Sequence, residues 1–304
     1  MEKLILSFSD EFIRAIGINN LNEIILMEEV SSIVDFGKDI SYYKNNTTVI
    51  SEISQLILSI LNTDISKIKK TGVVLDSAQA FLNIIPVDTN DDEKTINSQI
   101  MWEISNYFPE TYNDFNIKYL RLSNHKYTAN IDEALLIAID KFKIDFCRRI
   151  CNEIKLGLSS VEIDHFAAEK VLTDSYKEKI PVNSVLLTGH KAGRIDLSVI
   201  TNGKIRYYEF ISKDDNEYHD RFEKALKDLP VNIPDLNIKD IFVYGGDFSG
   251  NADENLTEIF KGAAINVIDP FFKIKLSREM LSEKSGDKNL HKYAPLCGLA
   301  SKMN

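Results

Sequence analysis

The stretch of 29 residues at 183–211 constrains the fold more than any other part of this 304-residue chain. It predicts three short strands, at Val185–Thr188, Arg194–Ile200 and Lys204–Ile211. The last two flank Asn202-Gly203, which is the strongest short signal for a β-hairpin, because both central positions of a type I′ turn need a positive φ. A strand, a glycine-bearing turn and a return hairpin are therefore expected late in the chain.

Elsewhere strands alternate with helices. Apolar residues at helical spacing predict a helix over Thr47–Leu61, and a second over Asp91–Phe108 that Pro109 ends. A strand at Ala80–Val87 is expected to end at Pro86, and a helix at Phe142–Leu156 to be capped by Gly157. This alternation along the whole chain indicates an α/β protein.

Charge and composition exclude several functional classes. The formal net charge is −10, whereas nucleic-acid binding needs a basic face. No apolar run approaches the ~20 residues of a membrane helix, so direct membrane insertion is not expected. Asp10 and Glu11 interrupt the apolar start of the chain, which is unlike a signal peptide, and a cytoplasmic location is expected.

Several motifs in a fixed order resemble the PilM family of type IV pilus assembly proteins and, more distantly, FtsA. They are QIMWEISNYFP at Gln99–Pro109, the strand–helix–glycine–strand run Ala134–Asp164, VYGG at Val243–Gly246, VIDPF at Val267–Phe271 and CGLA at Cys297–Ala300. Each motif alone is weak, and their shared order along the chain carries the resemblance.

The resemblance implies a two-lobed, actin-like (ribonuclease H-like) α/β fold with a reduced second lobe. The first lobe is expected at 1–83 and 158–183, with a small PilM/FtsA-like subdomain inserted at 84–157. The second lobe is expected at 184–304, with a closing C-terminal helix.

An active member of this superfamily needs acidic, glycine-containing turns that hold phosphate and metal. The positions that match the first turn are Ser7, Ser9 and Arg14, and the second turn has glycines but no acidic residue. We therefore expect no catalytic residues, no metal and no cofactor. The alternative is ATP with Mg²⁺ at a vestigial site formed by Ser9, Arg14, Gly189, Gly193, Gly245 and Gly246. For Gly245-Gly246, a simple tight turn is favoured.

Two surface features leave alternatives open. His190, Lys191 and Arg194 form a small basic patch that suits either an anion site or a solvated turn. Trp102 lies off the apolar stripe of its helix, which suits a partner anchor, although burial against a neighbouring strand is favoured.

The family resemblance implies an adaptor at the inner face of the cytoplasmic membrane. Such an adaptor holds the cytoplasmic tail of a bitopic, PilN-like membrane protein in the cleft between the first lobe and the inserted subdomain. The alternatives are an active ATPase of the same assembly and a filament-forming cytoskeletal protein; a homodimer is a further alternative for the oligomeric state.

Overall fold

The computed structural model describes residues 1–61, 65–122, 130–176, 183–213, 217–233, 235–246, 256–287 and 289–303. The expected lobe boundary near Pro181 lies outside these residues. Within them, no helix is long and apolar enough to cross a membrane.

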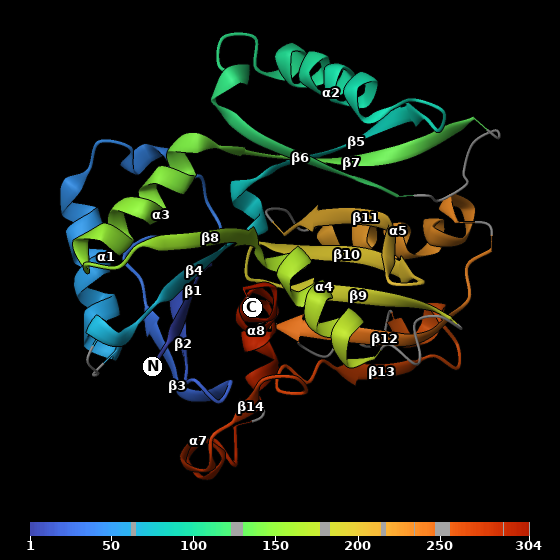
Figure 1. Cartoon of the computed structure of the whole chain (residues 1–304). Coiled ribbons are helices and arrows are strands. Elements are labelled where there is room, and N and C mark those ends of the chain that lie inside the picture. The colour runs from blue at the N-terminus through green and yellow to red at the C-terminus, as the bar shows by residue number, and fades with distance from the viewer. Residues whose placement is uncertain are drawn as a thin grey trace.

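Two mixed sheets of the same topology form the two lobes (Figure 1). The first has the order β14-β3-β2-β1-β4-β8, and the second β11-β10-β9-β12-β13. Apart from β14, which pairs parallel with β3 at the edge of the first sheet, each sheet has three antiparallel strands followed by two parallel ones. The strands of the first sheet are β1 (Lys3–Ser9), β2 (Phe12–Ile18), β3 (Glu23–Ser31), β4 (Lys70–Leu75), β8 (Leu158–Ile163) and β14 (Lys275–Leu276). Those of the second are β9 (Ser184–His190), β10 (Arg194–Thr201), β11 (Lys204–Ser212), β12 (Ile238–Gly245) and β13 (Ala264–Val267).

The three strands predicted in the second lobe are confirmed, each slightly longer than expected. Asn202 and Gly203 have φ of 53° and 71°, as a type I′ turn requires. Every residue of β9 is buried, because helices cover both faces of this central strand.

Two helices join the lobes into one core. α4 (Asp164–Ser175) and α8 (Ala294–Lys302) pack against each other between the two sheets (Figure 1). The main apolar cluster runs through them from Leu6 in β1 to Phe242 in β12. α1 (Thr47–Leu61), predicted with these bounds, covers the outer face of the first sheet together with α3 (Lys141–Glu153). α5 (Tyr218–Asn232) packs on the second sheet with a separate cluster, and a short helix, α7 (Arg278–Glu283), follows β14.

A third, smaller layer lies above both lobes (Figure 1). It consists of β5 (Phe81–Asp88), α2 (Glu93–Tyr107), β6 (Phe115–Arg121) and β7 (Ile131–Asp140), with the sheet order β5-β7-β6 and its own apolar cluster. The chain enters this layer after β4 and leaves it into α3, whose Phe146 and Ile150 belong to the core of the first lobe. Short 3-10 turns at Ile40–Tyr43, Ile65–Lys67, Ser77–Gln79, Tyr112–Asp114 and Leu290–Tyr293 complete the connections.

Two predicted element ends are wrong. Pro86 lies inside β5, opposite Glu133 of β7, because β5 is an edge strand that has no neighbour to need the missing N–H. Gly157 does not cap α3: the helix ends at Glu153, and Lys155 supplies the left-handed residue with φ 60°.

The close contact between α4 and α8 depends on a glycine. A Cβ at Gly298 would lie 1.7 Å from the carbonyl oxygen of Ala167, which is backbone and cannot move aside cheaply. We expect Gly298→Ala to lower the free energy of unfolding by about 1–3 kcal/mol or more through overpacking. Gly157→Ala is the control, because nothing lies within 4 Å of its added Cβ. Urea unfolding of both variants measures the difference; equal midpoints would contradict this account of the lobe junction.

Candidate functional site

The two turns that correspond to the phosphate-binding turns of the superfamily face one cavity between the lobes. The β1–β2 turn contributes Asp10, Glu11 and Phe12, and the β9–β10 turn contributes Ala192, Gly193 and Arg194. The cavity has a volume of about 610 Å³. Its acidic lining residues are Asp10, Glu11, Asp35 and Asp76, and its basic ones Lys38 and Arg194.

The structure brings together only part of the residue set expected for a vestigial nucleotide site. Gly193 lines the cavity. Ser9 is buried beside it and donates from Oγ to Asp76 Oδ2 at 3.1 Å. Arg14 of β2 does not line the cavity, and its Nε donates to Glu29 Oε2 at 2.5 Å.

Gly189 and Gly245 have packing roles. A Cβ at Gly189 would lie 2.4 Å from the Tyr244 hydroxyl, so this position in β9 admits only glycine beside that ring. Gly245 has φ +111°, and a Cβ there would lie 2.0 Å from the carbonyl oxygen of His190. Gly246 follows it, and a Cβ added at Gly246 would lie 3.8 Å from Arg14 Nη2. Gly245 thus ends β12 in a backbone conformation that other residues rarely adopt.

Three carboxylates converge on one lysine beneath the cavity. Lys191 Nζ lies 3.1 Å from Asp76 Oδ1, 2.9 Å from Asp164 Oδ2 and 2.9 Å from Asp196 Oδ2. It also donates to Ser77 Oγ. All four charged side chains are at most 4% exposed. The ammonium therefore occupies the centre of a buried acidic cluster, which we call the Lys191 cluster.

This arrangement corrects two expectations. The sequence predicted phosphate turns that have lost their acids, whereas the structure supplies Asp10 from the first turn and Asp76, Asp164 and Asp196 from other elements. Lys191 was expected in a basic patch that held an anion or lay in solvent, and it is instead a buried cation among acids. His190 and Arg194, the other members of that patch, are also buried.

Strand order explains why the acids meet. Asp76 follows β4 directly, and Asp164 follows β8 directly as the first residue of α4. These two strands are parallel neighbours, so their carboxyl ends lie at the same sheet edge. Asp196 comes from β10 of the other lobe, so the Lys191 cluster links the lobes. An acid directly after each of two neighbouring parallel strands is the sequence signal that could have found it.

A fourth carboxylate bridges the two turns. Asp10 Oδ1 accepts a hydrogen bond from the backbone N–H of Ala192 at 3.1 Å. In an active superfamily member, amides of such turns are the groups that hold phosphate oxygens. Asp10, with φ 49° at the tip of the β1–β2 turn, thus presents an anion of the chain itself to the second turn.

Burial and charge shift the ionisation of these groups in opposite directions. Burial raises the pKa of Asp164 to about 7 and that of Asp10 to about 6, and the Asp76 charge adds to both shifts. Burial also disfavours ionisation of Asp196, but Lys191 and Arg194 outweigh it and hold the Asp196 pKa well below its usual range. The three carboxylates in turn raise the pKa of Lys191 against the effect of burial. Lys191 and Asp196 are therefore a charged pair at neutral pH.

The second lobe adds a polar layer around Asp196. Arg194 Nη2 lies 2.9 Å from Asp196 Oδ1, and the Tyr208 hydroxyl donates to the same oxygen at 2.6 Å. His165 lies beside them, with Nδ1 at 3.1 Å from the Tyr244 hydroxyl and Nε2 at 2.9 Å from Ser198 Oγ. Burial lowers the His165 pKa to about 4, so this ring is neutral at physiological pH.

The residues present do not fit a Mg²⁺–triphosphate group. Among the described ranges, no group of three or more His, Cys, Asp or Glu side chains is placed to hold a metal ion. The Lys191 ammonium lies between the carboxylates that a divalent cation would need. The acidic lining of the cavity also repels a polyphosphate.

Trp102 lies far from this site. It is 62% exposed on α2, so the expectation that it is buried was wrong: Ile96, Ile100 and Ile104 fill the buried face of that helix.

Removal of the central cation tests the account of the Lys191 cluster. Lys191→Met leaves buried carboxylates without their counter-ion, and we expect a loss of about 3–5 kcal/mol in unfolding free energy at pH 8. The loss should shrink toward pH 5. Without Lys191 the folded-state pKa values of the acids rise above their unfolded values near 3.9. The free energy of unfolding of the variant therefore falls as the pH rises from the unfolded pKa values to the folded ones.

The control for this variant is Lys170→Met. Lys170 pairs with Asp174 at 2.8 Å, and Lys273 contacts the other oxygen of that carboxylate at 3.0 Å. Asp174 therefore keeps a counter-ion, and removal of Lys170, which is 35% exposed, should cost less than about 1 kcal/mol. Denaturant unfolding at pH 5 and pH 8 makes the comparison. A Lys191→Met cost equal to the control, or independent of pH, would contradict the burial of an ionised cluster.

Comparison with known proteins agrees with this architecture. The chain matches the solved PilM–PilN type IV pilus biogenesis complex with a TM-score of 0.77 at 12% identity, covering 99% of this chain and 98% of that one. A Bacteroides thetaiotaomicron protein with an actin-like ATPase fold matches with a TM-score of 0.50 at 10% identity, covering 93% and 95%. No curated protein matches the sequence. The chain has the actin-like fold that these similarities indicate.

The sequence model of one family decides the assignment. The model described as "Type IV pilus assembly protein PilM" matches residues 6–209, which is more than half of the chain. This chain therefore belongs to the PilM family of type IV pilus assembly proteins.

Proposed function

We propose that this chain is a non-catalytic, actin-fold adaptor of a type IV pilus or related secretion machine. It binds the cytoplasmic tail of a PilN-like bitopic membrane protein and so lies at the inner face of the cytoplasmic membrane. The partner is suggested by the PilM–PilN complex that the fold matches.

The observation that carries the non-catalytic part is the Lys191 cluster. Its ammonium lies among the carboxylates of Asp76, Asp164 and Asp196, which a metal ion would need as ligands, and Asp10 presents a carboxylate to the second turn. Both charges that a Mg²⁺–nucleotide would bring are thus replaced by side chains. This supports a junction of the two lobes that is held together without nucleotide.

The rival is an active ATPase of the same assembly, and one observation favours it. The cavity between the lobes persists at about 610 Å³, and Asp10 and Asp76 line it. In an active ATPase, these carboxylates would bind a metal ion after Lys191 had moved away from them. Binding measurements separate the two candidates.

The groove that suits a tail lies between the first lobe and the small upper layer. Two adjoining hollows, of about 370 and 450 Å³, share the lining residues Ile117, Lys118, Ile137 and Glu162. β6 and β8 flank this tail groove, and each is the edge strand of its sheet. An edge strand offers unpaired backbone groups to an extended peptide, and the isoleucines offer apolar contact for alternate side chains.

The first prediction concerns nucleotide. Titration of the protein with ATP and Mg²⁺ in a calorimeter should give no binding tighter than about 1 mM, or about 4 kcal/mol, because the chain's own charges fill the phosphate and metal positions. A tail-peptide titration of the same preparation is the control for active protein. Micromolar binding of ATP with Mg²⁺ would reject the non-catalytic reading.

The second prediction concerns the tail groove. Leu120 lines it from β6 and is 38% exposed, so Leu120→Glu places a charge on its apolar wall without opening the core. We expect the affinity for a peptide of the PilN-like protein's cytoplasmic tail to fall at least about tenfold, or ~1.4 kcal/mol.

Ile131→Glu is the matched control. Ile131 lies in the same small layer, is 43% exposed and lies outside both hollows of the groove. Fluorescence anisotropy with the labelled peptide compares the two variants. Equal affinities, both as tight as that of the unchanged protein, would place the tail elsewhere.

A further inference from the structure

Glu169 is a carboxylate in the tail groove that has no partner among the described residues. It lies in α4 and lines the second hollow together with Ile117, Ile137 and Phe166. Over the part of the chain that the structure describes, its side chain makes no hydrogen bond and no ion pair. A carboxylate half buried beside apolar side chains is costly unless a cation or donor reaches it.

The charged groups around Glu169 are already engaged or lie apart. Lys302 of α8 pairs with Glu162 of β8 at 2.8 Å, and Lys170 of α4 pairs with Asp174 at 2.8 Å. Lys118 lines the opposite wall from β6 but makes no ion pair with Glu169. The chain therefore provides several cations near this carboxylate, and none compensates it directly.

The ionisation of Glu169 agrees with that geometry. Burial raises its pKa to about 7, and the charge of Glu162 adds to the shift, whereas Lys302 and Lys170 oppose it. A cation bound beside it would favour the ionised form. Binding should then release a proton from the fraction of molecules in which Glu169 is protonated.

The occupant follows from the uncompensated carboxylate of Glu169 and from the position of a tail. Cytoplasmic segments next to a membrane helix are enriched in lysine and arginine. An extended tail in the groove would therefore bring a cationic side chain past α4.

We propose that Glu169 receives a lysine or arginine side chain of the tail peptide and so sets which tails the groove accepts. This proposal rests on the proposed function, namely that the groove holds the tail. A bidentate arginine or a lysine can each reach a carboxylate from an extended backbone.

A double-mutant cycle tests the proposal with the intact chain. Its four arms combine the unchanged protein or Glu169→Gln with the PilN-like tail peptide or a peptide in which lysines and arginines are replaced by glutamine. At pH 7.5, each single change should weaken binding about tenfold, as for loss of one charge-assisted hydrogen bond. The two changes together should weaken it no further.

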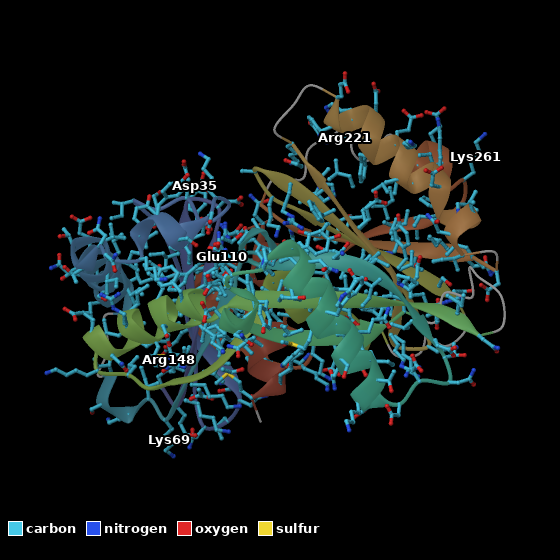
Figure 2. The ribbon with its side chains drawn as sticks, turned by 90° about the horizontal axis from the view of Figure 1, so that it is seen from above. Asp35, Lys69, Glu110, Arg148, Arg221 and Lys261 are labelled. Atoms are coloured by element: carbon cyan, nitrogen blue, oxygen red, sulfur yellow. The ribbon has the colours of Figure 1, made fainter. Side chains whose placement is uncertain are left out.

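Glu110→Gln is the protein control. Glu110 is exposed in the turn that follows α2 and lines neither hollow of the groove (Figure 2). This control should leave affinity unchanged. The affinity of the unchanged protein for the unchanged peptide should also rise from pH 6 to pH 8, and Glu169→Gln should remove that rise.

The outcomes distinguish this inference from the function on which it rests. Tail binding that Leu120→Glu weakens but Glu169→Gln does not would overturn the role of Glu169 and leave the adaptor intact. Additive single effects would likewise overturn it. A tail peptide that fails to bind the unchanged protein would reject the adaptor itself.

Discussion

The contact of Lys191 with three buried carboxylates is the interaction on which the junction of the lobes depends. Two of the acids follow parallel strands of the first lobe, and the third belongs to the second lobe. Ion pairs of this kind are expensive to bury and are kept only when every charge has its partner. Here the ammonium, the Ser77 hydroxyl and the Tyr208 hydroxyl supply those partners. The chain thus carries within itself the charge balance that a metal and a phosphate provide in an active superfamily member.

Helix α4 connects the cleft between the lobes to the tail groove. α4 begins at Asp164 in the Lys191 cluster and passes Glu169 in the groove one and a half turns later. It also packs against α8 between the two sheets (Figure 1). In the function that we propose, α4 therefore links the Lys191 cluster to the wall of the groove that receives the tail.

Local signals in the sequence predicted much of the fold. Asn202-Gly203 and the alternating strands around it predicted the hairpin, and the isoleucine spacing predicted α1 with its observed bounds. Local sequence patterns could not predict the Lys191 cluster, because Asp76 and Lys191 are 115 positions apart and meet only through tertiary packing. Comparing single turns with the active superfamily pattern missed acids that come from neighbouring strands. Trp102 was misjudged for a related reason: the exposure of a helix face depends on tertiary packing, and the packing of α2 leaves Trp102 62% exposed.

The central claim is that side chains fill the metal and phosphate positions between the lobes. The most direct measurement is a crystal structure of the protein grown with ATP and Mg²⁺ at millimolar concentration. We predict a cleft without nucleotide, with Lys191 within bonding distance of Asp76, Asp164 and Asp196 and with Asp10 on the amide of Ala192. A structure in which Mg²⁺ and ATP lie between the lobes and Lys191 has left the carboxylates would contradict the account.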